Sequence, residues 1–309
     1  MSVFTAHGLV CVVLSGVPGS AAAQAPPPGT PSGTPTPAAA GNTTTVTRSA
    51  AEPGAPATQV TLIALLTDDG QTIDQGVTWR VYRGRPGLDG KLSLVTQSKD
   101  AEAVVKLDPG EYIVNAAFGR AHLTRRIKIE AGKATTEKFV INAGGLKVNA
   151  VLATGEPAPE KSVQYDILSE ERDQFGQRIK VMPAAKPGLI IRLNAGIYRI
   201  VSTYGDANAT VSADLAVEPG KLTNATVTHS AAKITLKLVT QAGGEAIADT
   251  QWAILTAGGD VVKESAGALP SHILAPGKYA VTAKSGAQTY RRDFTVKGGD
   301  VAVVEVVAR

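Results

Sequence analysis

One short pattern occurs three times in this chain of 309 residues, and it limits what the chain can fold into. The pattern is Leu-x-Pro-Gly-x-Tyr with apolar residues alternating after it, and its copies begin at Leu107, Leu193 and Leu274. The second copy has Ala195 at the proline position. Proline and glycine favour a tight turn, and alternating apolar residues favour a strand, so each copy predicts a turn that leads into a β-strand. The structural turn glycines are Gly110, Gly196 and Gly277.

The three copies mark three tandem repeats. We place repeat 1, repeat 2 and repeat 3 at residues 59–142, 143–229 and 230–309. Repeats 1 and 3 align without a gap from the turn glycine to the next glycine turn, at Gly132 and Gly299. Short strands separated by frequent turns are typical of an antiparallel sandwich. We therefore predict an all-β protein of three tandem Ig-like, seven-stranded antiparallel β-sandwiches.

The second strand of each repeat contains one aromatic residue at a matching position. These residues are Trp79, Tyr165 and Trp252. An aliphatic residue follows two positions later in each repeat, and residues two apart in a strand share one face. We predict that the three aromatic side chains are structural and lie in the cores, although an exposed tryptophan could also stack on a sugar.

The first residues have the pattern of a signal peptide. An apolar run at residues 9–17 is followed by small residues, which predicts a signal peptide at 1–23 and export to the periplasm or the medium. No Lys or Arg precedes Arg48, which is unusual for such a signal. The only cysteine, Cys11, lies in this run, so the mature chain would have no disulfide. No other apolar run is long enough to cross a membrane.

Residues 24–58 are rich in Pro, Ala, Thr and Gly and almost lack large apolar side chains. Such a segment cannot bury enough surface to offset the entropy of ordering. We predict a disordered linker, and a recognition motif within it is the alternative.

At the repeated motif, the chain resembles the prealbumin-like, carboxypeptidase-regulatory-like superfamily of β-sandwiches, which is similar to collagen-adhesin B-type repeats. The resemblance covers the three repeats. It implies a carbohydrate-binding-like fold and a secreted or envelope module that binds protein or sugar, or that spaces other parts. It also implies a structural role for the turn tyrosines, which are Tyr112, Tyr198 and Tyr279.

Some collagen-adhesin-type repeats carry a Lys–Asn isopeptide bond. The strand lysines here, Lys147 and Lys237, alternate with aliphatic residues and are therefore predicted to point outward. We predict no such cross-link.

The basic residues are distributed unevenly among the repeats. The net charge of +4 is small for this length, so we expect no nucleic-acid partner. In repeat 1, Arg126 and Lys128 alternate with isoleucines and face solvent, and with Arg80 and Tyr82 they form a candidate ligand-binding surface for an anionic glycan or headgroup. The alternative is a solvated strand face that prevents edge pairing.

No pattern for catalysis or metal binding stands out. The histidines outside the signal, His122, His229 and His272, lie in different repeats and are expected to be exposed. We predict no enzyme, cofactor or metal site. Tyr82, Phe175 and Tyr204 are the aromatic residues that could line a sugar-binding groove, and that reading requires them to be exposed and close together.

The leading hypothesis is a non-catalytic, monomeric spacer or binding module of the periplasm or cell envelope, with an unknown envelope protein or glycan as partner. The alternative is a carbohydrate-binding accessory protein that recognises an anionic glycan through the basic strand face.

Overall fold

A computed structural model describes residues 57–309 of the chain. The predicted signal peptide and nearly all of the predicted linker lie outside the described residues. Within the described residues the chain forms 21 strands in six sheets and one short 3-10 turn, η1 (Glu160–Ser162). Each repeat contains a three-stranded and a four-stranded sheet around one core, so the predicted tandem β-sandwich fold is confirmed.

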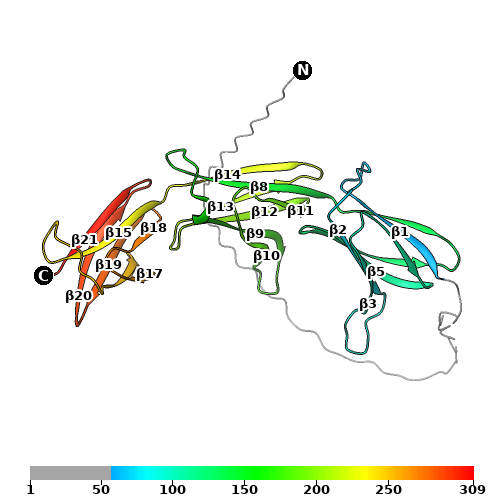
Figure 1. The fold of residues 1–309 in the computed structure, drawn as a ribbon, viewed down its shortest axis with the longest axis horizontal. Helices are drawn as coiled ribbons and strands as arrows, with labels where there is room; N and C mark the ends of the chain where they lie inside the picture. The colour runs from blue at the N-terminus through cyan, green and yellow to red at the C-terminus, as the bar shows by residue number, and fades with distance from the viewer. Residues whose placement is uncertain (1–56) are drawn as a thin grey trace, which may run out of the picture. The chain divides into compact units, whose positions relative to one another are not determined.

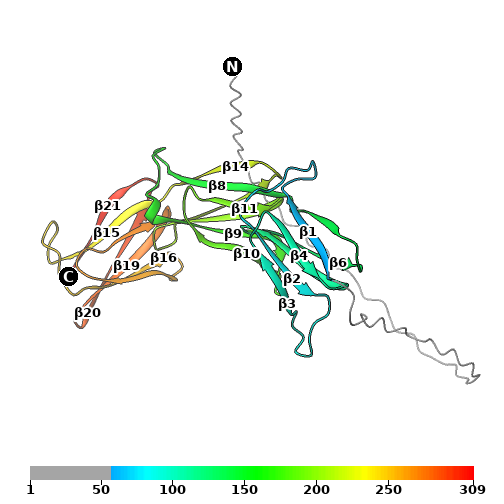
Figure 2. The same cartoon turned by 45° about the vertical axis from the view of Figure 1, so that its right-hand side comes forward.

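Repeat 1 consists of seven strands. Figures 1 and 2 label several of them, in blue to blue-green colours. Its strands are β1 (Thr58–Leu65), β2 (Val77–Arg83), β3 (Leu94–Ser98), β4 (Glu102–Leu107), β5 (Gly110–Phe118), β6 (Ala121–Ile129) and β7 (Thr135–Val140). The smaller sheet has the order β4-β1-β7, and the larger has the order β3-β2-β5-β6. Along β2 and β5 of the larger sheet, buried side chains alternate with half-buried ones, which is the pattern of a sheet with one covered face.

Repeat 2 has the same arrangement. Its strands are β8 (Ala143–Leu152), β9 (Val163–Arg172), β10 (Arg178–Ala185), β11 (Ile190–Asn194), β12 (Gly196–Tyr204), β13 (Thr210–Val217) and β14 (Leu222–His229). The sheet orders are β11-β8-β14 and β10-β9-β12-β13, so each strand has the same neighbours as its counterpart in repeat 1.

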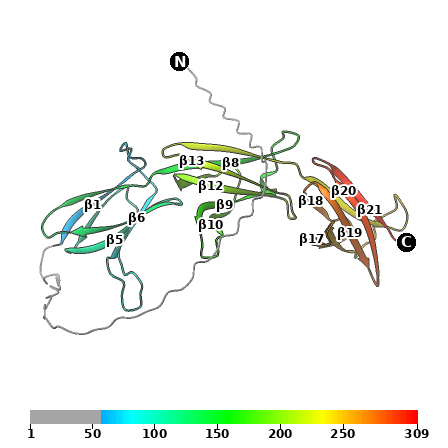
Figure 3. The same cartoon turned by 180° about the vertical axis from the view of Figure 1, so that it is seen from behind.

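Repeat 3 completes the series (Figure 3). Its strands are β15 (Ala232–Val239), β16 (Gln251–Thr256), β17 (Val261–Ala266), β18 (Ser271–Leu274), β19 (Gly277–Ser285), β20 (Gln288–Val296) and β21 (Val301–Val307). The sheet orders are β18-β15-β21 and β17-β16-β19-β20.

One pair of strands in each repeat is parallel, which differs from the purely antiparallel sandwich expected. The first and last strands pair in parallel, as β1 with β7, β8 with β14 and β15 with β21. Parallel neighbours need a long connection between them, and the five intervening strands provide it. Alternation along a strand reports which face is buried but not the direction of the neighbouring strand, so the sequence pattern could not predict this pair.

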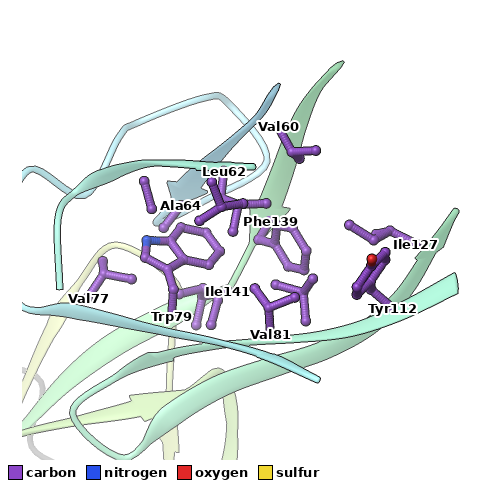
Figure 4. Close-up of a cluster of buried hydrophobic side chains, with 14 of the residues drawn as sticks. Val60, Leu62, Ala64, Val77, Trp79, Val81, Tyr112, Ile127, Phe139 and Ile141 are labelled. Atoms are coloured by element: carbon purple, nitrogen blue, oxygen red, sulfur yellow. The ribbon is translucent and has the colours of Figure 1, made fainter. Parts of the chain in front are cut away.

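The core of repeat 1 is built around Trp79, which is fully buried between the two sheets (Figure 4). Its indole ring meets the ring of Phe139 edge to face, with centroids 5.3 Å apart. The indole nitrogen donates a hydrogen bond of 3.0 Å to the carbonyl oxygen of Asp100, so burial leaves no polar atom unpaired. Trp252 has the corresponding place in repeat 3, where its indole donates to the carbonyl of Gly267 over 2.8 Å.

Tyr165 has the same place in the core of repeat 2 but lacks the corresponding hydrogen bond. Its side chain is buried, and its hydroxyl has no partner among the described residues. Burial raises the pKa of this hydroxyl to about 12, because the phenolate would lose its hydration. The exchange of tryptophan for tyrosine therefore retains the apolar ring and adds a polar group that the core does not satisfy.

Within residues 57–309, no helix has the length and the apolar composition that a membrane crossing requires.

Candidate functional site

The repeated motif forms the same tyrosine-centred turn in all three repeats. Each tyrosine hydroxyl donates a hydrogen bond to the carbonyl oxygen four residues earlier in the chain. The three bonds are Tyr112 to Asp108 (2.9 Å), Tyr198 to Asn194 (3.0 Å) and Tyr279 to Ala275 (2.9 Å). All three tyrosine side chains are buried. The bond closes the turn between two strands. It holds the end of a strand of the three-stranded sheet close to the start of a strand of the four-stranded sheet.

The turn glycines do not all serve for the same reason. Gly110 and Gly196 have φ values of 157° and 155°, a region that other residues rarely occupy. Gly277 lies outside this region. A Cβ atom at Gly277 would instead lie 3.4 Å from the ring of Tyr279, so the close approach of the ring is what a side chain would disturb there.

The motif turn of repeat 2 also contacts repeat 1. The side-chain oxygen of Asn194 accepts a hydrogen bond of 3.1 Å from the backbone N–H of His122. Its amide nitrogen donates to two carbonyl oxygens of repeat 1, those of His122 (3.1 Å) and Ile141 (2.8 Å). Beside it, the guanidinium of Arg192 lies 4.5 Å from the ring centroid of Phe118. One short amide side chain thus joins the two repeats through three hydrogen bonds.

This contact explains why the second motif lacks proline. The backbone N–H of Ala195 donates a hydrogen bond of 2.7 Å to the carbonyl oxygen of Asn142, one of the two residues between β7 and β8. Proline has no N–H and could not make this bond. The alanine therefore provides a bond at the junction, whereas Pro109 and Pro276 occupy turns that make no such bond.

The contact between repeats 2 and 3 uses the corresponding elements. The side chain of Asn208, from the β12–β13 turn, accepts from the N–H of Ala275 (3.1 Å) and donates to the hydroxyl of Tyr279 (2.8 Å). In the same turn, Asp206 lies 2.9 Å from the ammonium of Lys263 and 3.4 Å from the ring of His272. Partial loss of hydration raises the pKa of Asp206, whose side chain stays exposed, but hydrogen bonds from these two groups outweigh that effect and lower the pKa below its usual value.

Both junctions therefore place a hairpin of one repeat against the motif turn of the next. The hairpins are β5–β6 in repeat 1 and β12–β13 in repeat 2, and each has a glycine at its tip. A Cβ at Gly119 would lie 2.9 Å from the Cβ of Arg192, and one at Gly205 would lie 2.5 Å from the Cβ of Ile273. The corresponding Gly286 of repeat 3 has open space around it.

The four residues of the predicted basic surface lie on the outer face of the larger sheet of repeat 1. Tyr82 pairs with Ile113, which pairs in turn with Arg126, so these three form one row across β2, β5 and β6. Arg80 lies one row away on β2, and Lys128 lies opposite Glu111. The Glu111 carboxylate is 3.5 Å from the Arg126 guanidinium. Glu111, which no sequence motif singled out, offsets part of the positive charge of this face.

The three aromatic residues considered for sugar binding do not lie together. Tyr82 is half-buried on β2 of repeat 1, and Phe175 is exposed in the β9–β10 turn of repeat 2. Tyr204 ends β12 and packs against the core of repeat 2, with its ring 5.6 Å from that of His229. They form no shared groove, so the condition set for that hypothesis is not met.

The expectation of exposed histidines is wrong for two of the three. His229 is buried, and its ring lies 2.7 Å from the hydroxyl of Ser202. Burial lowers the pKa of His229, because the interior disfavours the charged ring. His272 is also buried and has Asp206 and Ser265 as partners. Among residues 57–309, no three His, Cys, Asp or Glu side chains form a group that could hold a metal ion.

The two strand lysines have different neighbours on the last strands. Lys237 pairs with Glu305 of β21, with 3.3 Å between ammonium and carboxylate. Lys147 lies beside Asn224 of β14, whose side chain is exposed. The absence of a Lys–Asn cross-link stays a prediction, which an intact mass without loss of ammonia would support.

A groove of about 610 Å³ lies where repeats 2 and 3 meet. Its lining includes three lysines from separate elements, none of which belongs to a motif of the sequence. They are Lys161, Lys186 and Lys233. The ring of Tyr204 and the side chain of Ile273 provide apolar surface in the same groove. Lysines this far apart in the sequence give no local signal that they line one site.

Comparisons with known proteins add one family and several solved structures. A family model described as the Rhizobiales growth-associated tandem repeat domain matches residues 233–308. This stretch lies within repeat 3 and is less than half of the chain. No curated protein sequence matches.

Several solved structures are similar to parts of this chain. The Bacillus anthracis TIE protein is 16% identical, with a TM-score of 0.26, and the match covers 82% of this chain and 51% of that one. The minor pilin GBS52 of Streptococcus agalactiae is 14% identical, with a TM-score of 0.31 and coverage of 56% and 95%. The major pilin subunit BcpA of Bacillus cereus is 10% identical, with a TM-score of 0.24 and coverage of 82% and 100%.

The chain thus spans about half the length of the TIE protein. Identities and TM-scores this low carry no conclusion about function.

Proposed function

We propose that this protein is a non-catalytic, exported spacer of the periplasm or cell envelope. In this proposal the three sandwiches hold a partner or ligand at a set distance, and residues 24–58 give reach. The observation that carries the proposal is the repeated junction, in which a hairpin of one repeat is hydrogen-bonded to the motif turn of the next. Freely jointed domains would gain nothing from such bonds, whereas a spacer needs them to limit bending.

Two further observations support the proposal. The three cores are filled by side chains from both sheets, and each sandwich is stabilised by its own buried aromatic residue. The match of repeat 3 to a model described as a tandem repeat domain agrees with a protein built from repeated folded units. A spacer role needs only repeated folded units and restricted junctions.

Spin-label distances across a junction test the proposal. Cysteines replace Thr136 on β7 and Thr226 on β14, both exposed, and Cys11 is changed to Ser. We expect a single narrow distance distribution, because the Asn194 bonds restrict the two repeats. A broad distribution in the otherwise unchanged chain would contradict the spacer role.

The second candidate is recognition of an anionic glycan through the basic face of repeat 1. It is favoured by the shared row of Tyr82 and Arg126 and by the nearby Arg80 and Lys128. The ion pair between Arg126 and Glu111 weakens it. Binding of an acidic oligosaccharide that Arg126→Ala abolishes would favour this function over a passive spacer.

A further inference from the structure

The groove between repeats 2 and 3 is lined by three lysines whose positive charges have no carboxylate partner among residues 57–309. Lys161 comes from η1, Lys186 follows β10, and Lys233 lies at the start of β15. Among residues 57–309, none of these three ammonium groups forms an ion pair with a carboxylate. Three like charges around one hollow repel each other, and a bound anion relieves that repulsion.

The one acidic side chain in the groove does not neutralise the lysines. The carboxylate of Asp206 is 2.9 Å from the ammonium of Lys263 and 3.4 Å from the ring of His272. Hydrogen bonds from Lys263 and His272 keep the pKa of Asp206 below its usual value. The lining thus contains three lysine ammonium groups and one carboxylate, and that carboxylate already has Lys263 and His272 as partners. A ligand therefore meets a net positive potential in the groove.

The remaining lining matches a sugar rather than a small inorganic ion. The groove holds about 610 Å³, within the ordinary range for binding sites of organic ligands. Ser162, Gln164 and Ser271 supply hydroxyl and amide groups, and Tyr204 and Ile273 supply apolar surface. Hydroxyl partners together with an aromatic surface suit the alternating polar and C–H faces of a sugar ring.

We propose that this groove binds an acidic oligosaccharide, with the carboxylate or sulfate groups of the sugar on Lys161, Lys186 and Lys233. Binding there contacts both repeats, so the sugar also strengthens their junction. This site is separate from the basic face of repeat 1, and it does not depend on the spacer role.

Titration of the full chain with an oligogalacturonate at low salt tests the site, with the methyl-esterified oligomer as the neutral counterpart. We expect the acidic oligomer to bind and the neutral one to bind at least about tenfold more weakly, since charge-assisted contacts are lost. The variant Lys161→Ala, Lys186→Ala, Lys233→Ala should lose at least about tenfold in affinity. The matched control removes three exposed lysines of repeat 1, at positions 91, 99 and 133, and should bind as the unchanged chain does.

Three results would overturn the proposal. The first is no binding of the acidic oligomer by the unchanged chain. The second is equal weakening by the groove variant and the matched control, which would indicate a general charge effect. The third is binding to vesicles of anionic phospholipid, lost in the groove variant, without binding of the oligosaccharide, which would assign the groove to a lipid headgroup.

Discussion

The side chain of Asn194 binds both backbone groups of His122, with 3.1 Å for the bond it accepts and 3.1 Å for the bond it donates. These residues are 72 positions apart and belong to successive repeats. A single amide side chain on the motif turn of repeat 2 thus binds the backbone of a strand of repeat 1. Such a paired bond fixes both distance and direction, which a single ion pair would not do.

Asn194→Ala is expected to loosen this junction. The change removes three hydrogen bonds and costs about 1 kcal/mol or more, because the N–H of His122 loses its partner. Amide hydrogen exchange at His122 should quicken, and the spin-label distance distribution across the junction should broaden. Asn149→Ala is the control. That exposed side chain on β8 forms no hydrogen bond with repeat 1 among residues 57–309, so its loss should leave both measurements unchanged.

Gly205→Ala is expected to weaken the junction between repeats 2 and 3. The new Cβ would lie 2.5 Å from the Cβ of Ile273, so the two repeats must move apart. Gly286→Ala is a matched control, because both glycines have positive φ, at 80° and 58°, but Gly286 has open space. The difference in thermal stability between the two variants measures the junction alone. Equal losses would show that backbone strain, and not the contact with Ile273, determines the effect.

Tyr165→Phe is expected to leave repeat 2 as stable as before or to stabilise it by up to about 1 kcal/mol, because it removes a buried hydroxyl without a partner. Tyr198→Phe, in the same repeat, removes the hydroxyl that donates to Asn194 and should destabilise by about 1 kcal/mol. Chemical denaturation of the two variants provides the comparison. A larger loss for Tyr165→Phe than for Tyr198→Phe would contradict the assignment of the two hydroxyls.

Repeat 2 is expected to lose stability in mild acid through His229. Its pKa in the folded chain is below the ordinary 6.5, so the unfolded chain takes up the proton first as the pH falls. The stability that the neutral His229 ring contributes to repeat 2 is fully present above pH 6.5. It is lost as the pH falls from there toward the pKa of the folded state. Hydrogen exchange of β12 and β14 at several pH values measures it. His229→Gln should flatten this dependence, and the exposed His122→Gln should not.

The sequence predicted the fold well because its strongest signals are local. The motif turns, the strands that follow them and the aromatic residue of each second strand all depend on neighbours within a few positions. Alternation along β2 predicted that Trp79 and Val81 face inward, and both are buried. The same parity placed Arg126 and Lys128 in solvent, where the structure has them.

The junctions could not be predicted in the same way. The one local signal was Ala195 at the position where the other two motifs have proline, and the pattern did not show what this alanine does. The structure shows that its N–H is used for a bond to Asn142. Burial of His229 was also missed, because it depends on Ser202 and Tyr204 from another strand.

The amino-acid sequence by itself determined three strand-rich repeats, their turns and the side chains that fill their cores, because period-two alternation and turn chemistry act between near neighbours. Only the tertiary structure decided that first and last strands pair in parallel, that Asn194 and Asn208 join successive repeats, and that Lys161, Lys186 and Lys233 line one groove. These relationships join residues far apart in the chain, and their free energy depends on positions that exist only after each sandwich has folded.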